Sequence, residues 1–222
     1  FLTKLSHTKV ELTYNLMRTF VAGLAFAMPF SLVYQMMSDR MKGLQKSEKV
    51  IKGLPFAAGF TAGTAVSIAG NMHYVIYAQI IPLIEKLTGK EVSSYWFPDA
   101  TRYIGYNPYR EEDRTIHEFP CYSFVLGDLH AHVVNIMFVL LVIALLYVWL
   151  RGVRKKTVPV ETSMKDGKFW KEQLLMPHLL VISALLGMFQ WTNFWDFVIY
   201  YVVTLGTAVS YTHLRAHETS QD

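Results

Sequence analysis

The sequence has 222 residues, of which 52% are hydrophobic and 17% are charged, and its formal net charge is +4. Soluble domains usually carry about 25% charged residues, so this composition favours a membrane protein. The basic residues gather in two short loops, which membrane topology explains better than a track for nucleic-acid phosphates. We therefore expect the lipid bilayer as a partner and expect no nucleic acid.

The two ends of the chain indicate a fragment. The sequence begins at Phe1 rather than at Met, and no signal-peptide pattern precedes the first apolar run, so we expect part of a longer protein. Residues 209–222 interrupt an apolar segment and resemble translated sequencing adapter. We interpret 209–222 as a non-native tail and leave it out of the functional argument. The single cysteine, Cys121, excludes an internal disulfide.

Long uncharged runs predict an all-α fold, a polytopic transmembrane helix bundle with a long extracytoplasmic loop. The run 19–38 gives a helix of about 30 Å, which matches the hydrocarbon thickness of a bilayer. The run that begins at Leu54 is rich in small residues, which let membrane helices pack closely. Its last part either continues the helix or turns along the membrane interface. The expected spans, which form one multi-pass domain over 1–208, are 19–38, 54–78, 133–150, 174–190 and 197–208.

Charge places the loops between these spans on opposite sides of the cell membrane. Lys-rich loops at 39–52 and 151–171 mark the cytoplasmic side. The outer loop 85–132 and the turn 191–196 then share the other side. We therefore expect the polar residues of these two outer segments to converge on one site: Glu118, Asp128, His130, His132, Asn193 and Asp196.

The stretch 115–132 sets one Glu, one Asp and three His in a run that is otherwise apolar and aromatic, and ionisable groups at the mouth of a membrane helix indicate function. Asp128, His130 and His132 are spaced by two, so all three share a face if the segment is extended, and only Asp128 and His132 do so on a helix. Carboxylate and imidazole groups suit zinc, manganese or a related divalent metal, with Glu118 or Asp196 completing the shell. Alternatively, a carboxylate oriented by histidine acts as a general base.

Structural roles for the two carboxylates stay open beside the catalytic ones. Asp128 could cap the helix that follows it, because its oxygen would satisfy unpaired amides. Glu118 precedes Phe119 and Pro120, and the residue before a proline favours extended backbone. Glu118 could therefore form a salt bridge to Arg114 or Arg102 and clamp the loop.

Four further residues are candidates for binding substrate. Arg102 could hold a phosphate or carboxylate through its bidentate fork, or it could pair with Asp99. Trp191, Asn193 and Asp196 combine aromatic faces with a carboxylate, which suits a sugar or a polyprenyl head group.

Membrane anchoring explains the tryptophan equally well, and the aromatic residues between Tyr95 and Tyr109 are likewise typical of a membrane interface. We expect Asn71 and His73 to form interhelical hydrogen bonds.

The segments 96–104, 115–132 and 191–197 resemble the YYY membrane-protein family, an uncharacterised multi-pass family. The resemblance covers about 18–208. The sequence departs from the family pattern at His117, where the family has asparagine, and at Ala131, where it has proline. His117 is therefore not expected to be a functional residue of the family.

The YYY family is similar, more remotely, to large membrane glycosyltransferases that use polyprenyl-phosphate sugars. This analogy implies a transferase at the outer face, with a polyprenyl-phosphate sugar as the donor and an acidic catalytic residue on an outer loop. Asp128 would act as base or metal ligand with support from Glu118, His130 and His132, and Arg102 would lie near the phosphate. The alternatives are a transporter or channel subunit, which places ionisable groups at mid-bilayer depth, and a non-enzymatic membrane scaffold.

Overall fold

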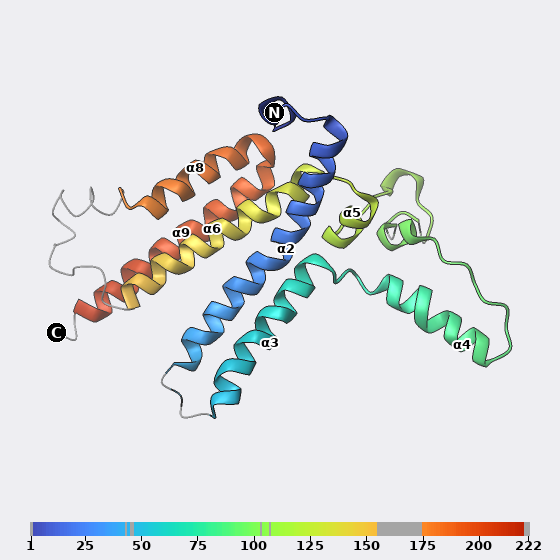
Figure 1. Ribbon diagram of the computed structural model, residues 1–222, viewed down its shortest axis with the longest axis horizontal. Coiled ribbons are helices and arrows are strands. Elements are labelled where there is room, and N and C mark those ends of the chain that lie inside the picture. The colour runs from blue at the N-terminus through green and yellow to red at the C-terminus, as the bar shows by residue number, and fades with distance from the viewer. Residues whose placement is uncertain are drawn as a thin grey trace. The chain divides into compact units, whose positions relative to one another are not determined.

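A computed structural model describes residues 2–42, 44, 47–102, 104–106, 108–154 and 175–219. The chain divides into two compact units, Phe1–Val133 and Val134–Asp222, and each is considered by itself. The regular elements of both units are helices (Figure 1). Within the described ranges there is no β-strand, and an isolated bridge joins Tyr106 to Tyr109. The expectation of an all-α membrane bundle is therefore confirmed.

The first unit begins with a short helix, α1 (Leu2–Ser6), and continues into the long helix α2 (Val10–Met41). The 32 residues of α2 extend for about 48 Å, which exceeds the bilayer's hydrocarbon thickness of about 30 Å. The sequence analysis placed this span at 19–38, because Arg18 and Asp39 bound the uncharged run. Charged side chains do not end a helix, so α2 begins before the expected span and includes Arg18.

Helix α3 (Glu48–Ser67) lies beside α2 in Figure 1. The buried residues of both helices recur every four positions, so each helix presents one row to the other. Glycine lets the two backbones approach closely: a Cβ atom on Gly59 or Gly63 would lie 2.8 or 2.9 Å from a backbone carbonyl oxygen of α2. This confirms the expected role of the small residues after Leu54. The buried rows are Val21, Ala25 and Pro29 on α2, and Pro55, Gly59, Gly63 and Ser67 on α3.

The uncharged run 54–78 is not one continuous helix, which corrects the expected span there. Helix α3 ends at Ser67, and Met72 adopts a left-handed backbone with φ of 65°. A second helical segment then consists of the π-helix η1 (Val75–Ile80) and α4 (Ile81–Leu87). The wide π turn accommodates Pro82, which lacks an amide donor and whose ring would clash in a regular helix. Absence of charge therefore did not ensure helical continuity.

The remainder of the expected outer loop contains three short helices. They are the 3-10 helices η2 (Phe97–Thr101) and η3 (Glu111–Asp113), and the α-helix α5 (Pro120–Leu126). Helix α6 (Ala131–Arg154) begins at the end of the first unit and carries the chain into the second.

The second unit packs α6 against α8 (Pro177–Thr192) and α9 (Phe194–Thr219). Both α6 and α8 contribute three core residues at positions i, i+4 and i+7, the spacing of one helical face. Asn193 alone separates α8 from α9. The core residues are Val142, Leu146 and Trp149 on α6, and Ile182, Leu186 and Phe189 on α8.

Three of the described helices are long and apolar enough to cross a membrane: Val10–Met41, Ala131–Gly152 and Phe194–Leu214. They contain the expected spans 19–38, 133–150 and 197–208. Helix α8 is a shorter apolar helix of 16 residues, and most of the expected loop 151–171 lies outside the described residues. Helix α9 continues through 209–219, and the interpretation of 209–222 as a non-native tail stays a prediction.

We predict that Gly63→Ala destabilises the α2–α3 pair, whereas Gly53→Ala does not. The new methyl group at Gly63 would press on the backbone oxygen of Phe26, and such overpacking costs about 1–3 kcal/mol. A methyl group at Gly53 would meet no neighbouring atom within 4 Å, so alanine there gains helix propensity of up to about 1 kcal/mol. Thermal unfolding in detergent measures both variants. Equal shifts of the midpoint would contradict close packing at Gly63.

Candidate functional site

Backbone hydrogen bonds between two parts of the outer loop place Glu118. The amide of His117 donates to the carbonyl of Thr101 at 2.9 Å, and the amide of Thr115 donates to that of Ile104 at 3.3 Å. Thr101 is fully buried, so this pairing gives the segment before Glu118 a fixed support. Gly105 makes the pairing possible, because its φ is 74° and the backbone of Asp113 lies directly against it.

The Phe119–Pro120 pair starts helix α5 directly after Glu118. Phe119 has extended backbone, with φ of −132° and ψ of 156°, and Pro120 occupies the first helical turn, where its missing amide costs nothing. The Phe119 ring packs against Gly70 and, at 5.7 Å, against the ring of Tyr122. Extended backbone next to this proline was expected, and the structure confirms it.

Gly127 ends α5 and turns the chain toward Asp128. It adopts a left-handed backbone with φ of 76°, and the amide of Asp128 donates to the carbonyl of Ser123 at 2.8 Å, as in a Schellman motif. The Tyr14 hydroxyl on α2 donates to the carbonyl of Gly127 at 2.9 Å, and the Arg18 guanidinium lies against the same glycine. The part of α2 before the expected span therefore holds the turn that presents Asp128.

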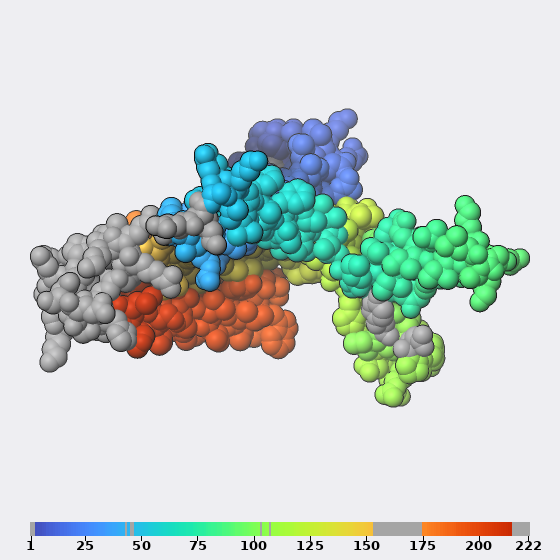
Figure 2. Space-filling view, turned by 90° about the horizontal axis from the view of Figure 1, so that it is seen from below, coloured from blue at the N-terminus to red at the C-terminus, as the bar shows by residue number. Residues whose placement is uncertain are grey.

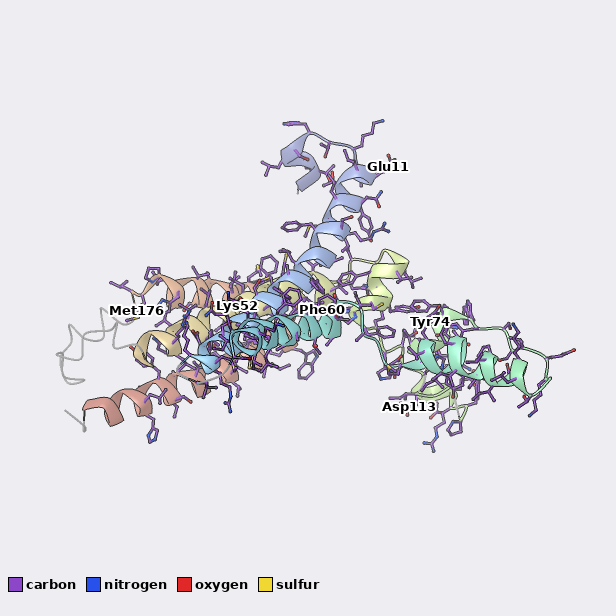
Figure 3. The ribbon with its side chains drawn as sticks, turned by 60° about the horizontal axis from the view of Figure 1, so that its bottom comes forward. Glu11, Lys52, Phe60, Tyr74, Asp113 and Met176 are labelled. Atoms are coloured by element: carbon purple, nitrogen blue, oxygen red, sulfur yellow. The ribbon has the colours of Figure 1, made fainter. Side chains whose placement is uncertain are left out.

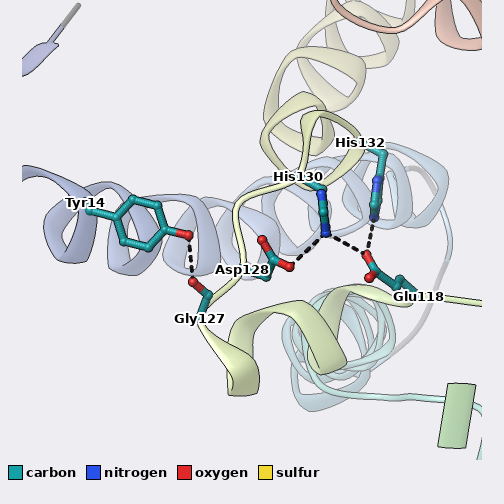
Figure 4. Close-up of polar contacts among 6 residues, drawn as sticks. All are labelled: Tyr14, Glu118, Gly127, Asp128, His130 and His132. Atoms are coloured by element: carbon teal, nitrogen blue, oxygen red, sulfur yellow. Dashed lines mark hydrogen bonds and ion pairs between the residues drawn. The ribbon is translucent and has the colours of Figure 1, made fainter. Parts of the chain in front are cut away.

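Glu118, Asp128, His130 and His132 come together in one cluster (Figure 4). The Nε2 atom of His130 lies 2.8 Å from Oδ2 of Asp128 and 3.5 Å from Oε2 of Glu118. The Nε2 atom of His132 lies 3.7 Å from the same glutamate oxygen, and the two imidazole rings stack with centroids 5.7 Å apart. His130 thus bridges the two carboxylates.

The cluster has the ligand types and spacing for a divalent metal. One ligand atom each from Glu118, Asp128 and His130 lies within 4.8 Å of the others. Oxygen and nitrogen ligands bind zinc at about 2.0–2.2 Å, so a small inward movement would bring all three into coordination. Asp128 and His130 are about half exposed and Glu118 is 24% exposed, which leaves an open side for a substrate. The three closest ligand atoms thus come from Glu118, Asp128 and His130, whereas His132 contacts Glu118 and stacks on His130. The set of Asp128, His130 and His132 stays a prediction.

Two of the structural alternatives do not match the observed contacts. Helix α6 begins at Ala131, three residues after Asp128, and the Asp128 carboxylate contacts His130. Glu118 contacts the histidines, and among the described residues it forms no salt bridge to Arg102 or Arg114. Both carboxylates are instead directed at His130.

Arg102 does not pair with Asp99 among the described contacts. Its guanidinium lies over the ring of Trp96 at 4.2 Å and within 5.8 Å of the Tyr106 ring centre. Its buried Nε atom has no hydrogen-bond partner in the described part of the chain. Arg114 approaches the same Tyr106 ring at 5.7 Å. An arginine held by stacking alone keeps its hydrogen-bond donors for a ligand.

Asn71 and His73 both contact the outer loop, Asn71 at the 3-10 helix η2. The Asn71 amide donates to the carbonyl of Ala100, and the His73 Nδ1 lies 3.2 Å from the hydroxyl of Tyr95. Cys121 is partly buried, and burial raises the pKa of its thiol. Burial of this thiol therefore favours its protonated form.

The second unit places the other predicted residues around a buried asparagine. Oδ2 of Asp196 accepts hydrogen bonds from Asn135 at 2.7 Å and from Asn193 at 3.0 Å. Asn135 is only 2% exposed, so this carboxylate ties α6 to the α8–α9 turn. Trp191 is 91% exposed, which suits either membrane anchoring or a ligand contact. Convergence of these residues with Glu118 and Asp128 stays a prediction.

Sequence reasoning missed four residues that contact the candidate site residues or the loop segments that carry them. Tyr14 and Arg18 belong to a helix more than a hundred positions before Gly127, and no local pattern connects them. Arg114 was considered only as a partner of Glu118. Asn135 lies inside an apolar run, where a lone amide could have been recognised as a polar group that needs a partner.

Helices of membrane-crossing length and composition define a multi-pass membrane protein. The chain belongs to the family described as Uncharacterized membrane protein (DUF2298), whose model matches residues 1–220. The match extends into 209–222, the segment that the sequence analysis set aside. Neither the curated proteins nor the solved structures contain a match to this chain.

We predict that Gly105→Ala destabilises the protein more than Gly89→Ala does. Both glycines have positive φ, so both substitutions pay about 1–2 kcal/mol for left-handed backbone. Only at Gly105 would the new Cβ lie 2.5 Å from a backbone oxygen, that of Asp113, whereas Gly89 has open space around it. Thermal unfolding of both variants in detergent gives the comparison. Similar losses of stability would contradict the tight loop pairing that supports Glu118.

Proposed function

We propose that this protein is a membrane transferase that moves a sugar from a lipid-phosphate donor to an acceptor at the outer membrane face. The observation that supports it most is the cluster of Glu118, Asp128 and His130, whose ligand atoms lie within 4.8 Å of one another directly before a membrane-crossing helix. Ionisable groups at this position are costly and indicate function. The class of donor rests on the resemblance to the YYY family and, through it, to glycosyltransferases.

Asp128 is the proposed general base of this reaction. Its Oδ2 atom lies 2.8 Å from His130, an arrangement that orients a carboxylate for proton transfer. The carboxylate takes the proton of the acceptor hydroxyl as the acceptor oxygen bonds to the anomeric carbon. The bond from that carbon to the phosphate oxygen breaks, and the lipid phosphate leaves with the electron pair.

Glu118 is the proposed second carboxylate of the site. It contacts the Nε2 atoms of both His130 and His132, so it links the two imidazoles. Glu118, Asp128 and His130 would hold a divalent cation, which when bound supplies positive charge toward a phosphate. His132 supports this set through Glu118.

Arg102 is the proposed phosphate contact. Stacking on Trp96 fixes its guanidinium without an acidic partner among the described residues, which suits an anionic ligand. Trp191, Asn193 and Asp196 remain proposed contacts for the sugar or the polyprenyl head group. The hydrogen bonds of Asp196 to Asn135 and Asn193 support a structural role for this carboxylate as well as they support a ligand contact.

We predict that Asp128→Asn in the full-length parent protein lowers transfer from polyprenyl-phosphate sugars by about 10²–10⁴-fold, the usual contribution of a general base. The assay uses purified protein in detergent with a panel of donors, with and without chelator. Asp113→Asn is the matched control, because it changes an exposed acid of the same loop outside the cluster. Its activity should equal that of the wild type.

Loss of activity on adding the chelator would support binding of a divalent cation in the site. No turnover from any donor, with wild type and variants equally stable, would overturn the proposal that the protein is a transferase. Transport or a scaffold role would then be the better assignment.

A further inference from the structure

The helical segment formed by η1 and α4, from Val75 to Leu87, carries a row of exposed apolar side chains. None of its residues is buried. The large side chains recur at the spacing of one helical face, which gives the segment an uncovered apolar face. Val75 is exposed outside this face, and the exposed members of the face are Ile76, Tyr77, Ile80, Leu83, Ile84 and Leu87. In Figure 2 the surface of this segment is open along its length on the face seen.

This segment is too short to cross a bilayer. Its six residues in η1 and seven in α4 extend for about 20 Å, against a hydrocarbon core of about 30 Å. Apolar helical segments of this length in membrane proteins lie along the interface or re-enter the bilayer. The choice between these two depends on what lies at each end.

One end of the segment is aromatic. Tyr74, at the start of the segment in Figure 3, packs on Tyr95 with ring centres 5.6 Å apart. His73 contacts the same tyrosine, and Trp96 follows it with 54% of its surface exposed. Tyrosine and tryptophan concentrate at the level of the lipid head groups. These contacts bring the returning chain back to the start of the helical segment and close a hairpin.

The other end is charged. Glu85 accepts hydrogen bonds from the amide of Ser93 at 2.8 Å and from its hydroxyl at 2.9 Å, which closes the hairpin near its tip. Lys86, Lys90 and Glu91 are exposed there. A charged tip is costly at the bilayer centre, which opposes a re-entrant path. Both ends therefore belong at the head-group level.

We propose that the segment Val75–Leu87 lies flat in the head-group region of the bilayer that the protein's own helices cross. Its apolar face enters the acyl boundary by about 5–10 Å, and Lys86 with Lys90 stays among the head groups. Gln79, the uncharged polar side chain of η1, donates to the Tyr74 hydroxyl at 3.2 Å, so it needs no partner outside the segment. Lipid is favoured over a protein partner because the hairpin follows α3, which packs closely on the membrane-crossing helix α2, and because aromatic residues bound it. This inference does not depend on the proposed transferase.

Spin labels test the depth of the segment in the full chain, reconstituted in phosphatidylcholine vesicles. On a Cys121→Ser background, Ile80→Cys and Leu83→Cys report the apolar face, and Lys90→Cys and Glu91→Cys report the exposed charged tip. We expect the labels at positions 80 and 83 to collide more with oxygen than with a water-soluble nickel chelate, at the same shallow depth. The labels at positions 90 and 91 should favour the nickel chelate.

Three outcomes would overturn the proposal. Nickel accessibility at all four positions would place the segment in water. A label at position 83 that lies clearly deeper than the label at position 80 would show a re-entrant path. Low collision rates with both reagents would show a protein surface over the apolar face. If the Leu83→Cys variant does not fold, Ile84→Cys reports the same face.

Discussion

The contact of His130 with two carboxylates is the interaction on which the candidate site depends. Glu118 precedes helix α5 and Asp128 follows it, so seven helical residues separate two acids that reach the same imidazole. Proline at one end of α5 and left-handed Gly127 at the other fix the directions in which the chain enters and leaves. The short helix therefore acts as a spacer, and its length sets the distance between the two carboxylates.

Supports from distant parts of the first unit hold this spacer in place. Tyr14 bonds to the turn after α5, Gly70 receives the ring of Phe119, and buried Thr101 accepts the amide of His117. Each contact reaches a different element, so the cluster does not rely on local propensity alone. A site at a membrane edge needs such support because its ionisable groups are costly to desolvate.

The members of the cluster could be predicted because Glu118, Asp128, His130 and His132 stand close together in the sequence and few other residues there can ionise. Their contacts could not be predicted, because the spacing of two residues left extended and helical geometry equally open. The left-handed turn at Gly127 and the Tyr14 hydroxyl decide between them, and the second of these comes from a helix far away in sequence. The break after Ser67 was missed for a different reason: hydropathy records the absence of charge, whereas helical continuity also depends on backbone geometry at Met72.

Binding of a divalent cation to the full-length protein tests the cluster most directly. Titration with Mn²⁺, followed by the electron paramagnetic resonance signal of the free ion, compares wild type with His130→Ala and with His117→Ala. His117 is an exposed imidazole of the same loop outside the cluster, so its variant is the matched control. The account predicts that wild type and His117→Ala bind alike and that His130→Ala binds at least about tenfold more weakly. Equal binding by all three proteins, or no binding by the wild type, would contradict a metal centre at Glu118, Asp128 and His130.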